Sequence, residues 1–366
     1  MPSPNRQKFF GPFFQKRTSC LNLDPSPPRE LSRTLSSDPR ETSVLIGHAQ
    51  AEAAILDSLR GRRLHHAWLI SGPEGVGKAT LAYRFARRLL AGGTASLDMD
   101  PSHQVFRRVA AATHADLLTV EREWDEKKKR MKKSIAAETV RGVPSFLHLT
   151  PAEGGWRVVL VDGTEDVNAF SANALLKVLE EPPARAVLIL VCSAAGRLLP
   201  TIRSRCRHLA LSPLSDAEME QALAPVLPTM PAAERDMLIG LAEGSPGRAL
   251  MLAEEGGLKL AAMVGEVLQA GPDIALQRAY EMSDSLREQA AFETFMALLQ
   301  RGIAGAVTAS IRGTANPVQM RLVQARSPLH WAEVAEALGR LTAETERANM
   351  DRRQAVVAGL ALLRAA

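Results

Sequence analysis

Cysteine is scarce in this sequence. The 366 residues include only Cys20, Cys192 and Cys206, which lie far apart along the chain. Three scattered thiols exclude a disulfide framework and a zinc site built on four cysteines. Such low cysteine usage is typical of proteins in a reducing compartment, so we expect a cytoplasmic location.

Long apolar runs are also missing. One of the longest, residues 187–191, is far shorter than the roughly 20 residues that a helix needs to cross a bilayer. We therefore expect no membrane span. Hydrophobic residues still make up 46% of the chain. That share is enough to fill the cores of two or three domains.

Positive charge is present in only modest excess. The formal net charge is +5, and residues 1–41 hold seven Lys and Arg against four Asp and Glu, which leaves +2 for the remainder. This distribution does not predict a broad nucleic-acid-binding surface, so any such contact must come from local placement or through an assembly. The run at residues 126–133 holds six Lys and Arg. Because no aromatic platform organises it, a solvated loop is favoured over a DNA-binding stripe.

The first 41 residues contain seven prolines and many serines, without an amphipathic period. This composition predicts a disordered N-terminal extension, residues 1–41. The segment lacks the apolar core of a signal peptide. The phenylalanine pairs at residues 9–10 and 13–14 could dock on a partner, but a leader without a role, or a misassigned start, is the simpler interpretation. We assign the segment no function.

A phosphate-binding P-loop with one unusual residue follows a short apolar strand. The pattern G-x-x-x-x-G-K-S/T runs from Gly72 to Lys78, but Ala79 stands where it requires Ser or Thr. In such loops backbone N–H groups wrap the phosphates, the lysine reaches the terminal phosphates, and the hydroxyl binds Mg²⁺. The helix expected after the loop adds its N-terminal dipole to this anion site. The candidate nucleotide-binding residues are Gly72, Gly75, Gly77, Lys78, Thr80 and Asp162.

The metal-binding half of the site is incomplete. Thr80 carries a hydroxyl, but one step along a helix turns a side chain by about 100°, so we expect it to point away from the metal. Asp162 ends an aliphatic strand, where it would hold Mg²⁺ through water, although an N-capping role is the alternative. A hydrolase would place a glutamate next, and this chain has Gly163. Glu165 and Asp166 follow, but the sequence does not indicate that they aim at the same point.

Alternating strands and helices predict an α/β P-loop core with a mostly parallel sheet covered on both faces. The expected strands are 67–70, 157–162 and 187–191, and the expected helices are 80–90, 136–147 and 169–181. From residue 212 onward the pattern is helical, with longer helices at 274–282, 286–304, 331–341 and 347–364. We predict a P-loop domain at 42–210, a small helical lid at 211–258 and an all-α C-terminal collar domain at 270–366.

Two further motifs follow the P-loop. They are Asn173-Ala-Leu-Leu-Lys-Val-Leu-Glu-Glu-Pro-Pro183 and Thr201-Ile-Arg-Ser-Arg-Cys206. A generic P-loop protein has no reason to carry both. Together they resemble the bacterial clamp-loader subunits of the AAA+ superfamily, over residues 42–255 by motif and over 270–366 by size and helical character. The resemblance implies an ATPase-type core, a lid and a collar that holds a five-membered ring together.

The sequence differs from the ATP-hydrolysing members of this family at positions that serve one nucleotide site. In the ATP-hydrolysing members the P-loop ends in Lys-Ser/Thr, the strand-end Asp is followed by Glu, and the lid motif carries a sensing arginine. This chain has Ala79, Gly163 and Gly247 at those positions, with Arg248 one position late. All three altered positions serve the chain's own nucleotide. The resemblance therefore implies a subunit that does not hydrolyse ATP.

The Ser-Arg-Cys motif, by contrast, is intact. In the family its arginine, here Arg205 between Ser204 and Cys206, reaches the ATP of the neighbouring subunit. An arginine supplied in this way stabilises the γ-phosphate charge that grows in the transition state. The resemblance thus implies that this chain donates an arginine finger in trans and completes the adjacent ATPase site.

The resemblance also implies a set of partners. They are the gamma/tau-type ATPase and delta subunits of a hetero-pentameric ring and, through it, the sliding clamp and primer-template DNA. ATP or ADP is the nucleotide that the P-loop would hold, without hydrolysis. The family's zinc-binding cysteine cluster is absent, and His103 and His114 alone do not make a zinc site. Two alternatives stay open: an active clamp-loader ATPase with Mg²⁺ on Thr80, and a freestanding AAA+ remodelling ATPase that assembles with itself.

Overall fold

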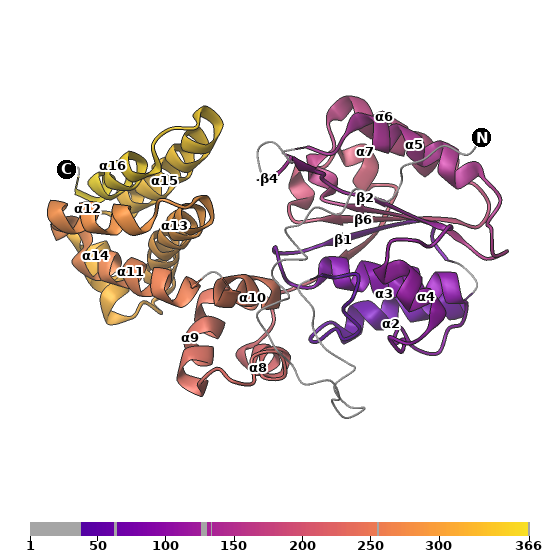
Figure 1. The fold of residues 1–366 in the computed structure, drawn as a ribbon, viewed down its shortest axis with the longest axis horizontal. Coiled ribbons are helices and arrows are strands. Elements are labelled where there is room, and N and C mark those ends of the chain that lie inside the picture. Colours follow the sequence, from indigo (N-terminus) through magenta and orange to yellow (C-terminus); the bar gives the residue numbers. More distant parts are fainter. Residues whose placement is uncertain (1–37, 62–63, 126–129, 133, 255, 365–366) are drawn as a thin grey trace. The chain divides into compact units, whose positions relative to one another are not determined.

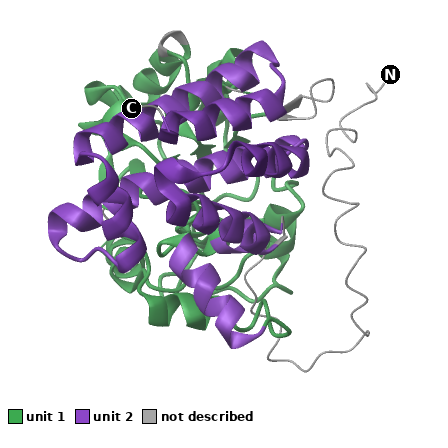
Figure 2. Ribbon diagram, turned by 90° about the vertical axis from the view of Figure 1, so that its left-hand side faces the viewer, with its two compact units in different colours: residues 1–230, 242–248 green, residues 231–241, 249–366 purple. Residues whose placement is uncertain are grey.

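The structure, a computed structural model, describes residues 38–61, 64–125, 130–132, 134–254 and 256–364. Most of the predicted N-terminal extension and of the basic run at 126–133 lies outside the described residues. The chain divides into two compact units, residues 1–230 with 242–248 and residues 231–241 with 249–366 (Figure 2). The predicted lid contributes residues to both units, so the domain boundaries stay a prediction.

The first unit contains a five-stranded sheet in the order β2-β5-β6-β1-β7. Its strands are β1 (Ala67–Ser71), β2 (Leu117–Val120), β5 (Arg157–Asp162), β6 (Ala186–Cys192) and β7 (Arg207–Ala210). Every neighbouring pair is parallel, which confirms the predicted α/β class. The carboxyl ends of the strands meet at one edge, where Ser71 pairs with Cys192 and Asp162 with Val191.

Helices cover both faces of this sheet (Figure 1). One face carries α2 (Ala49–Arg60), α3 (Lys78–Ala91) and α4 (Gln104–Ala110), and there Trp68 meets the Phe85 ring edge-on, with centroids 5.3 Å apart. The other carries α5 (Ala137–His148) and α6 (Ala169–Glu180), whose Val140 and Leu175 join one buried cluster with Leu188 of β6. Alternate residues of each strand therefore fill opposite layers of the core.

Shorter elements connect this scaffold. They are the 3₁₀ turns η3 (Thr164–Asp166) and η4 (Ala195–Arg197), the one-turn helix α7 (Pro200–Arg203), and a hairpin of β3 (Trp124–Asp125) and β4 (Arg130–Met131). The sequence patterns did not predict β2, β7 or α4. Both strands lie at the edges of the sheet, and β7 is mostly exposed, so neither carries the continuous apolar run that identifies a buried strand.

A buried arginine holds the chain segment before α2 against α3. Arg87 is 1% exposed, and its guanidinium donates to the carbonyl oxygens of Arg40 at 2.8 Å and of Thr42 at 2.7 Å. It also lies over the Phe106 ring, 4.3 Å from the centroid. Burial lowers the pKa of Arg87 to about 9. Arg87 thereby holds residues 40–42 against α3.

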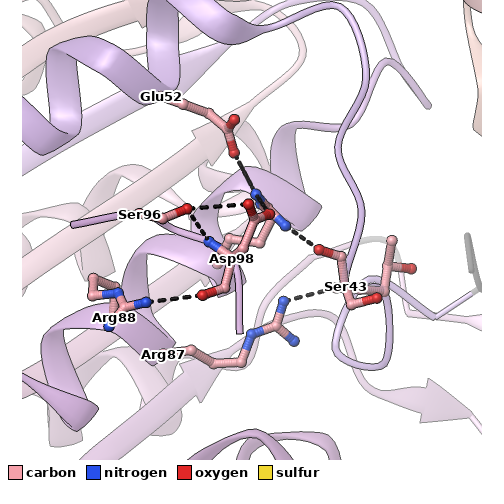
Figure 3. Close-up of polar contacts among 8 residues, drawn as sticks. Ser43, Glu52, Arg87, Arg88, Ser96 and Asp98 are labelled. Carbon is pink, nitrogen blue, oxygen red and sulfur yellow. Dashed lines mark hydrogen bonds and ion pairs between the residues drawn. The ribbon is translucent and has the colours of Figure 1, made fainter. Parts of the chain in front are cut away.

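Neighbouring arginines of α3 extend this network (Figure 3). Arg84, also buried, forms ion pairs with Glu52 at 2.7 Å and with Asp98 at 2.8 Å, and it donates to the Ser43 carbonyl. Arg88 donates to the Asp98 carbonyl at 2.8 Å. These contacts join residues that lie between 10 and 41 positions apart in the sequence, so no local pattern reveals them.

The remaining helices begin with α8 (Asp216–Leu223) in the first unit. They continue with α9 (Ala232–Ala242), α10 (Pro246–Glu254), α11 (Gly257–Ala270), η5 (Gly271–Asp273), α12 (Leu276–Ser285), α13 (Gln289–Arg312), α14 (Pro317–Ala325), α15 (Pro328–Ala348) and α16 (Arg352–Arg364). The all-helical character is confirmed. The helix predicted at 347–364 is wrong at its start, because α15 runs to Ala348 and Asn349, with a φ of +50°, ends it.

The long helix α13 is the centre of the second unit. It packs against α11, α14, α15 and α16. By length and composition alone α13 could cross a membrane, with a mean hydropathy of 1.2. Its Phe292, Phe295 and Leu299 are fully buried by the surrounding helices. This packing is that of a core helix.

Candidate functional site

The P-loop connects β1 to α3, as the sequence predicts. Gly72, Gly75 and Gly77 have φ values of +150°, +74° and +110°, which side chains with a Cβ rarely adopt. At Gly72 a Cβ would also lie 2.4 Å from the carbonyl oxygen of Leu211. The loop ends directly at the N-terminus of α3, where unpaired N–H groups favour an anion.

Lys78 is the first residue of α3 and lies inside the loop. It is 7% exposed, and its Nζ donates to the Pro73 carbonyl oxygen at 2.6 Å. Burial lowers the pKa of Lys78, whereas the nearby carboxylates of Asp162 and Glu165 raise it. The structure thus brings the predicted lysine and the predicted strand-end aspartate into one electrostatic site.

Asp162 lies at the carboxyl end of β5, next to β6 in the sheet. Burial, together with the charge of Glu121, raises the pKa of Asp162 to about 6, and Lys78 acts in the opposite direction. A carboxyl group with this pKa changes its ionisation state near pH 6 rather than near pH 4. A bound cation would lower its pKa again.

Glu165 reaches this site although the sequence left its direction open. Its Oε1 accepts a hydrogen bond of 2.7 Å from the Ser193 backbone N–H, just after β6. Its Oε2 is buried and has no partner among the described residues. Gly163 has a left-handed φ of +79° and precedes η3, in which Glu165 lies two residues later. The charge of Glu165 lies close enough to Lys78 and Asp162 to raise the pKa of both.

Thr80 is buried in the first turn of α3. It is 7% exposed, and within the described part of the chain its hydroxyl makes no hydrogen bond to the P-loop or to Asp162. Ala79, one residue earlier, has no hydroxyl at all. The donor set for Mg²⁺ therefore lacks the hydroxyl that P-loop sites use.

Residues 244–248 dock directly on the tip of the P-loop. Ser245 Oγ donates to the Glu74 carbonyl oxygen at 2.7 Å, and the Gly247 N–H donates to the Gly75 carbonyl oxygen at 2.9 Å. A Cβ at Gly247 would lie 2.9 Å from Gly75 Cα, and one at Gly75 would lie 2.5 Å from Ser245 Oγ. Two backbones touch here without side chains between them.

This contact explains the altered lid motif. The resemblance predicts a sensing arginine at the position of Gly247, and a Cβ there would lie 2.9 Å from Gly75 Cα. Arg248, one residue later, pairs with Glu243 at 2.7 Å and donates to the Ala242 carbonyl. Its side chain is thus engaged at the end of α9. The sequence revealed the missing arginine but not the close contact that takes its place.

Arg205 belongs to a different part of the unit. It follows α7, and its guanidinium pairs with Glu180 of α6 at 3.0 Å and donates to the Thr201 carbonyl oxygen at 3.0 Å. Its side chain is 37% exposed. Among the residues that the structure describes, none of its polar contacts is with the P-loop. The predicted finger is therefore separate from the predicted nucleotide-binding residues and faces solvent.

Ser204 and Cys206 flank this arginine in different ways. Ser204 Oγ donates to the Thr201 carbonyl at 3.2 Å. Cys206 packs against the core cluster, and burial raises the pKa of its thiol to about 12. A thiol in that state stays protonated and unreactive at neutral pH. Cys206 and the buried Ile202 fix the turn on which Arg205 is carried.

The predicted absence of zinc concerns His103 and His114. His103 Nδ1 accepts from the Val105 N–H and caps α4, and His114 Nδ1 accepts from the Asp116 N–H. Within the described ranges, no group of three or more His, Cys, Asp or Glu residues could hold a metal ion. Both histidines thus have structural partners.

Comparison with known proteins agrees with this arrangement. A family model described as "DNA polymerase III, delta subunit" matches residues 47–215. The DNA polymerase III subunit delta' of Pseudomonas aeruginosa is 38% identical over 206 residues, covering 56% of this chain and 61% of that protein. Its Escherichia coli counterpart is 33% identical over 201 residues, covering 54% and 57%.

A DNA polymerase III subunit gamma is also similar. The protein from Buchnera aphidicola is 30% identical over 190 residues, covering 52% of this chain and 50% of its own length. The chain thus spans about half to three fifths of the relatives that it matches. The matched segment holds the P-loop, Asp162 and the Ser-Arg-Cys motif. Residues 47–215 are thus similar to the delta and delta' subunits of DNA polymerase III.

Proposed function

We propose that this chain is the delta' subunit of a DNA polymerase III clamp loader and that it donates Arg205 to the ATP site of a neighbouring ATPase subunit. One observation carries the proposal. Arg205 is presented on an anchored, solvent-facing turn, while the chain's own P-loop lacks the hydroxyl for Mg²⁺. A guanidinium aimed at the γ-phosphate of another subunit stabilises the charge that develops there during transfer.

The proposed partners follow from this role. They are gamma/tau-type ATPase subunits and a delta subunit in a hetero-pentameric ring, with the sliding clamp and primer-template DNA reached through that assembly. The delta' and gamma names of the similar proteins support them. The cytoplasm is the proposed location, since a replication subunit works there.

The P-loop residues fit a phosphate group better than they fit a metal ion. Lys78, the glycines at positive φ and the α3 N-terminus suit ATP or ADP, and bound nucleotide would supply phosphate charge to pair with Lys78. Ala79 and the buried Thr80 leave Asp162 without its usual hydroxyl partner for Mg²⁺. We therefore propose that any nucleotide held by this chain is not hydrolysed by it.

The test is an Arg205→Ala variant in a reconstituted loader. We expect normal folding and assembly, with ATP turnover by the assembled loader lowered by about 10³-fold or more at the site that Arg205 completes. The other ATP sites of the ring receive arginine fingers from other subunits. Turnover should therefore be measured in a loader in which only the ATPase subunit next to Arg205 is active. Unchanged turnover at saturating subunit concentration would exclude the arginine-finger role. Arg203→Ala, two residues away and exposed, is the matched control.

A further inference from the structure

The guanidinium of Arg205 forms an ion pair with Glu180, a residue outside the Ser-Arg-Cys motif. Glu180 is the last residue of α6, and its Oε1 lies 3.0 Å from a terminal nitrogen of Arg205. The other terminal nitrogen donates to the Thr201 carbonyl at 3.0 Å. The guanidinium is therefore fixed at two points, one on α6 and one on α7.

Both anchors rest on the same core. Leu175, Val178 and Leu179 of α6 and Ile202 of α7 are buried in one hydrophobic cluster, against which Cys206 also packs. The distance between the backbones of Glu180 and Arg205 is thus set by rigid packing rather than by a loop. An arginine placed in this way loses less side-chain freedom when it meets a ligand than an unrestrained one does.

The pair leaves the guanidinium available. The Glu180 side chain is 53% exposed and that of Arg205 is 37% exposed. One terminal nitrogen donates to the Thr201 carbonyl and, at 3.5 Å, to Ser204 Oγ, while the other pairs with Glu180. The second N–H of that other nitrogen and the Nε–H are further donors that can face a phosphate. Glu180 can therefore stay bound while Arg205 meets a second anion.

We propose that Glu180 is a positioning residue for Arg205: its carboxylate holds the guanidinium ready for the triphosphate of the neighbouring subunit. This inference rests on the proposed arginine-finger function. Glu180 touches no reacting atom and acts through Arg205 alone. Its contribution should be modest and salt-dependent, because the pair is exposed to solvent.

A double-mutant cycle in the reconstituted loader tests this proposal. Glu180→Ala should lower kcat for ATP hydrolysis at the adjacent site by about twofold to fivefold, as expected for an exposed ion pair, with little change in the KM for ATP. In an Arg205→Ala background, the same Glu180→Ala change should have no further effect. The deficit of Glu180→Ala should also shrink as the salt concentration rises.

Glu181→Ala is the matched control, because Glu181 is the next carboxylate and is exposed. It should leave kcat unchanged. An equal loss from Glu180→Ala with and without Arg205 would overturn the positioning role, as would wild-type turnover in Glu180→Ala at low salt. If Arg205→Ala itself has no effect, the arginine-finger function fails instead, so the two failures are distinguishable.

Discussion

At the scale of single residues, Asp162 shows how burial and charge act on one group. Burial and the charge of Glu121 raise its pKa from 3.8 to about 6, against the opposing effect of Lys78. The folded chain therefore binds this proton more tightly than the unfolded chain does. Ionisation of Asp162 thus costs stability, and the cost grows as pH rises from about 4 to about 6.

Asp162→Asn should remove that cost. We expect the free energy of unfolding to increase by about 1–3 kcal/mol at pH 7 and to change little near pH 4, where both states hold the proton. Urea denaturation across this pH range measures the difference. Asp57→Asn, an exposed carboxylate on α2, should show no such pH dependence. A variant less stable than the wild type at pH 7 would mean that the Asp162 carboxylate is stabilised by Lys78 rather than penalised by burial.

Glu165 lies near Lys78 and Asp162, although the linear motif places no glutamate there. The residue directly after Asp162 is glycine, so the motif alone indicates that no glutamate serves the site. The structure supplies one from two positions later, held by the Ser193 N–H. Linear spacing did not find it, because a left-handed residue such as Gly163 redirects the chain in a way that no spacing rule includes.

At the scale of elements, the contact between the P-loop and residues 244–248 joins two segments more than 160 residues apart. Both hydrogen bonds use carbonyl oxygens of the loop tip, on Glu74 and Gly75. P-loop amides, which are the groups that bind phosphate, are not consumed by these bonds. The contact therefore fixes the loop from its outer side.

Gly247→Ala should loosen this contact. Its Cβ would lie 2.9 Å from Gly75 Cα, and such overpacking against backbone typically costs about 1–3 kcal/mol. We expect faster amide hydrogen exchange in residues 72–78 and a lower unfolding temperature, measured by mass spectrometry and thermal melting.

Gly240→Ala provides the control for this change. A Cβ at Gly240 in α9 meets no atom within 4 Å, and replacing a helical glycine by alanine usually stabilises by up to about 1 kcal/mol. This variant should leave exchange in the P-loop unchanged. Equal exchange in Gly247→Ala and wild type would show that the close approach does not hold the loop.

At the scale of the whole molecule, the proposed function pairs an altered site in this chain with an arginine that acts on a neighbour. We predict that the purified chain alone neither forms a ring nor hydrolyses ATP in a manner that depends on Lys78. Sedimentation with and without ATP, and turnover compared with Lys78→Ala, measure both properties. Addition of ATPase and delta subunits should yield a hetero-oligomer.

The competing assignments give different outcomes in the same assays. Turnover by the isolated chain that Lys78→Ala abolishes would indicate an active clamp-loader ATPase. A homomeric ring would indicate a freestanding AAA+ enzyme. Arg205→Ala should assemble as the wild type does, since the helices of the second unit are the proposed oligomerisation domain.

Local patterns determined much of this protein. The P-loop and the strand that ends at Asp162 each lie within a dozen residues, so glycine geometry and apolar periodicity were sufficient to predict them. The Ser-Arg-Cys turn was found through its resemblance to a family motif. The parallel α/β core and the helical remainder followed from the same periodicities. Edge strands β2 and β7 and the short helix α4 escaped prediction because their short or half-exposed segments carry no strong period. Helices α11 and α14 were also not predicted, although the buried residues of α11 recur at helical spacing.

Contacts between distant segments were decided by the tertiary structure alone. Arg87 against the carbonyls of Arg40 and Thr42, Gly247 against Gly75, and Glu180 against Arg205 each depend on packing that no local pattern encodes. The sequence by itself thus identified an altered nucleotide site and an intact arginine. Only the fold, by packing distant segments against common cores, decided that residues 245 and 247 contact the P-loop and that Glu180 pairs with Arg205.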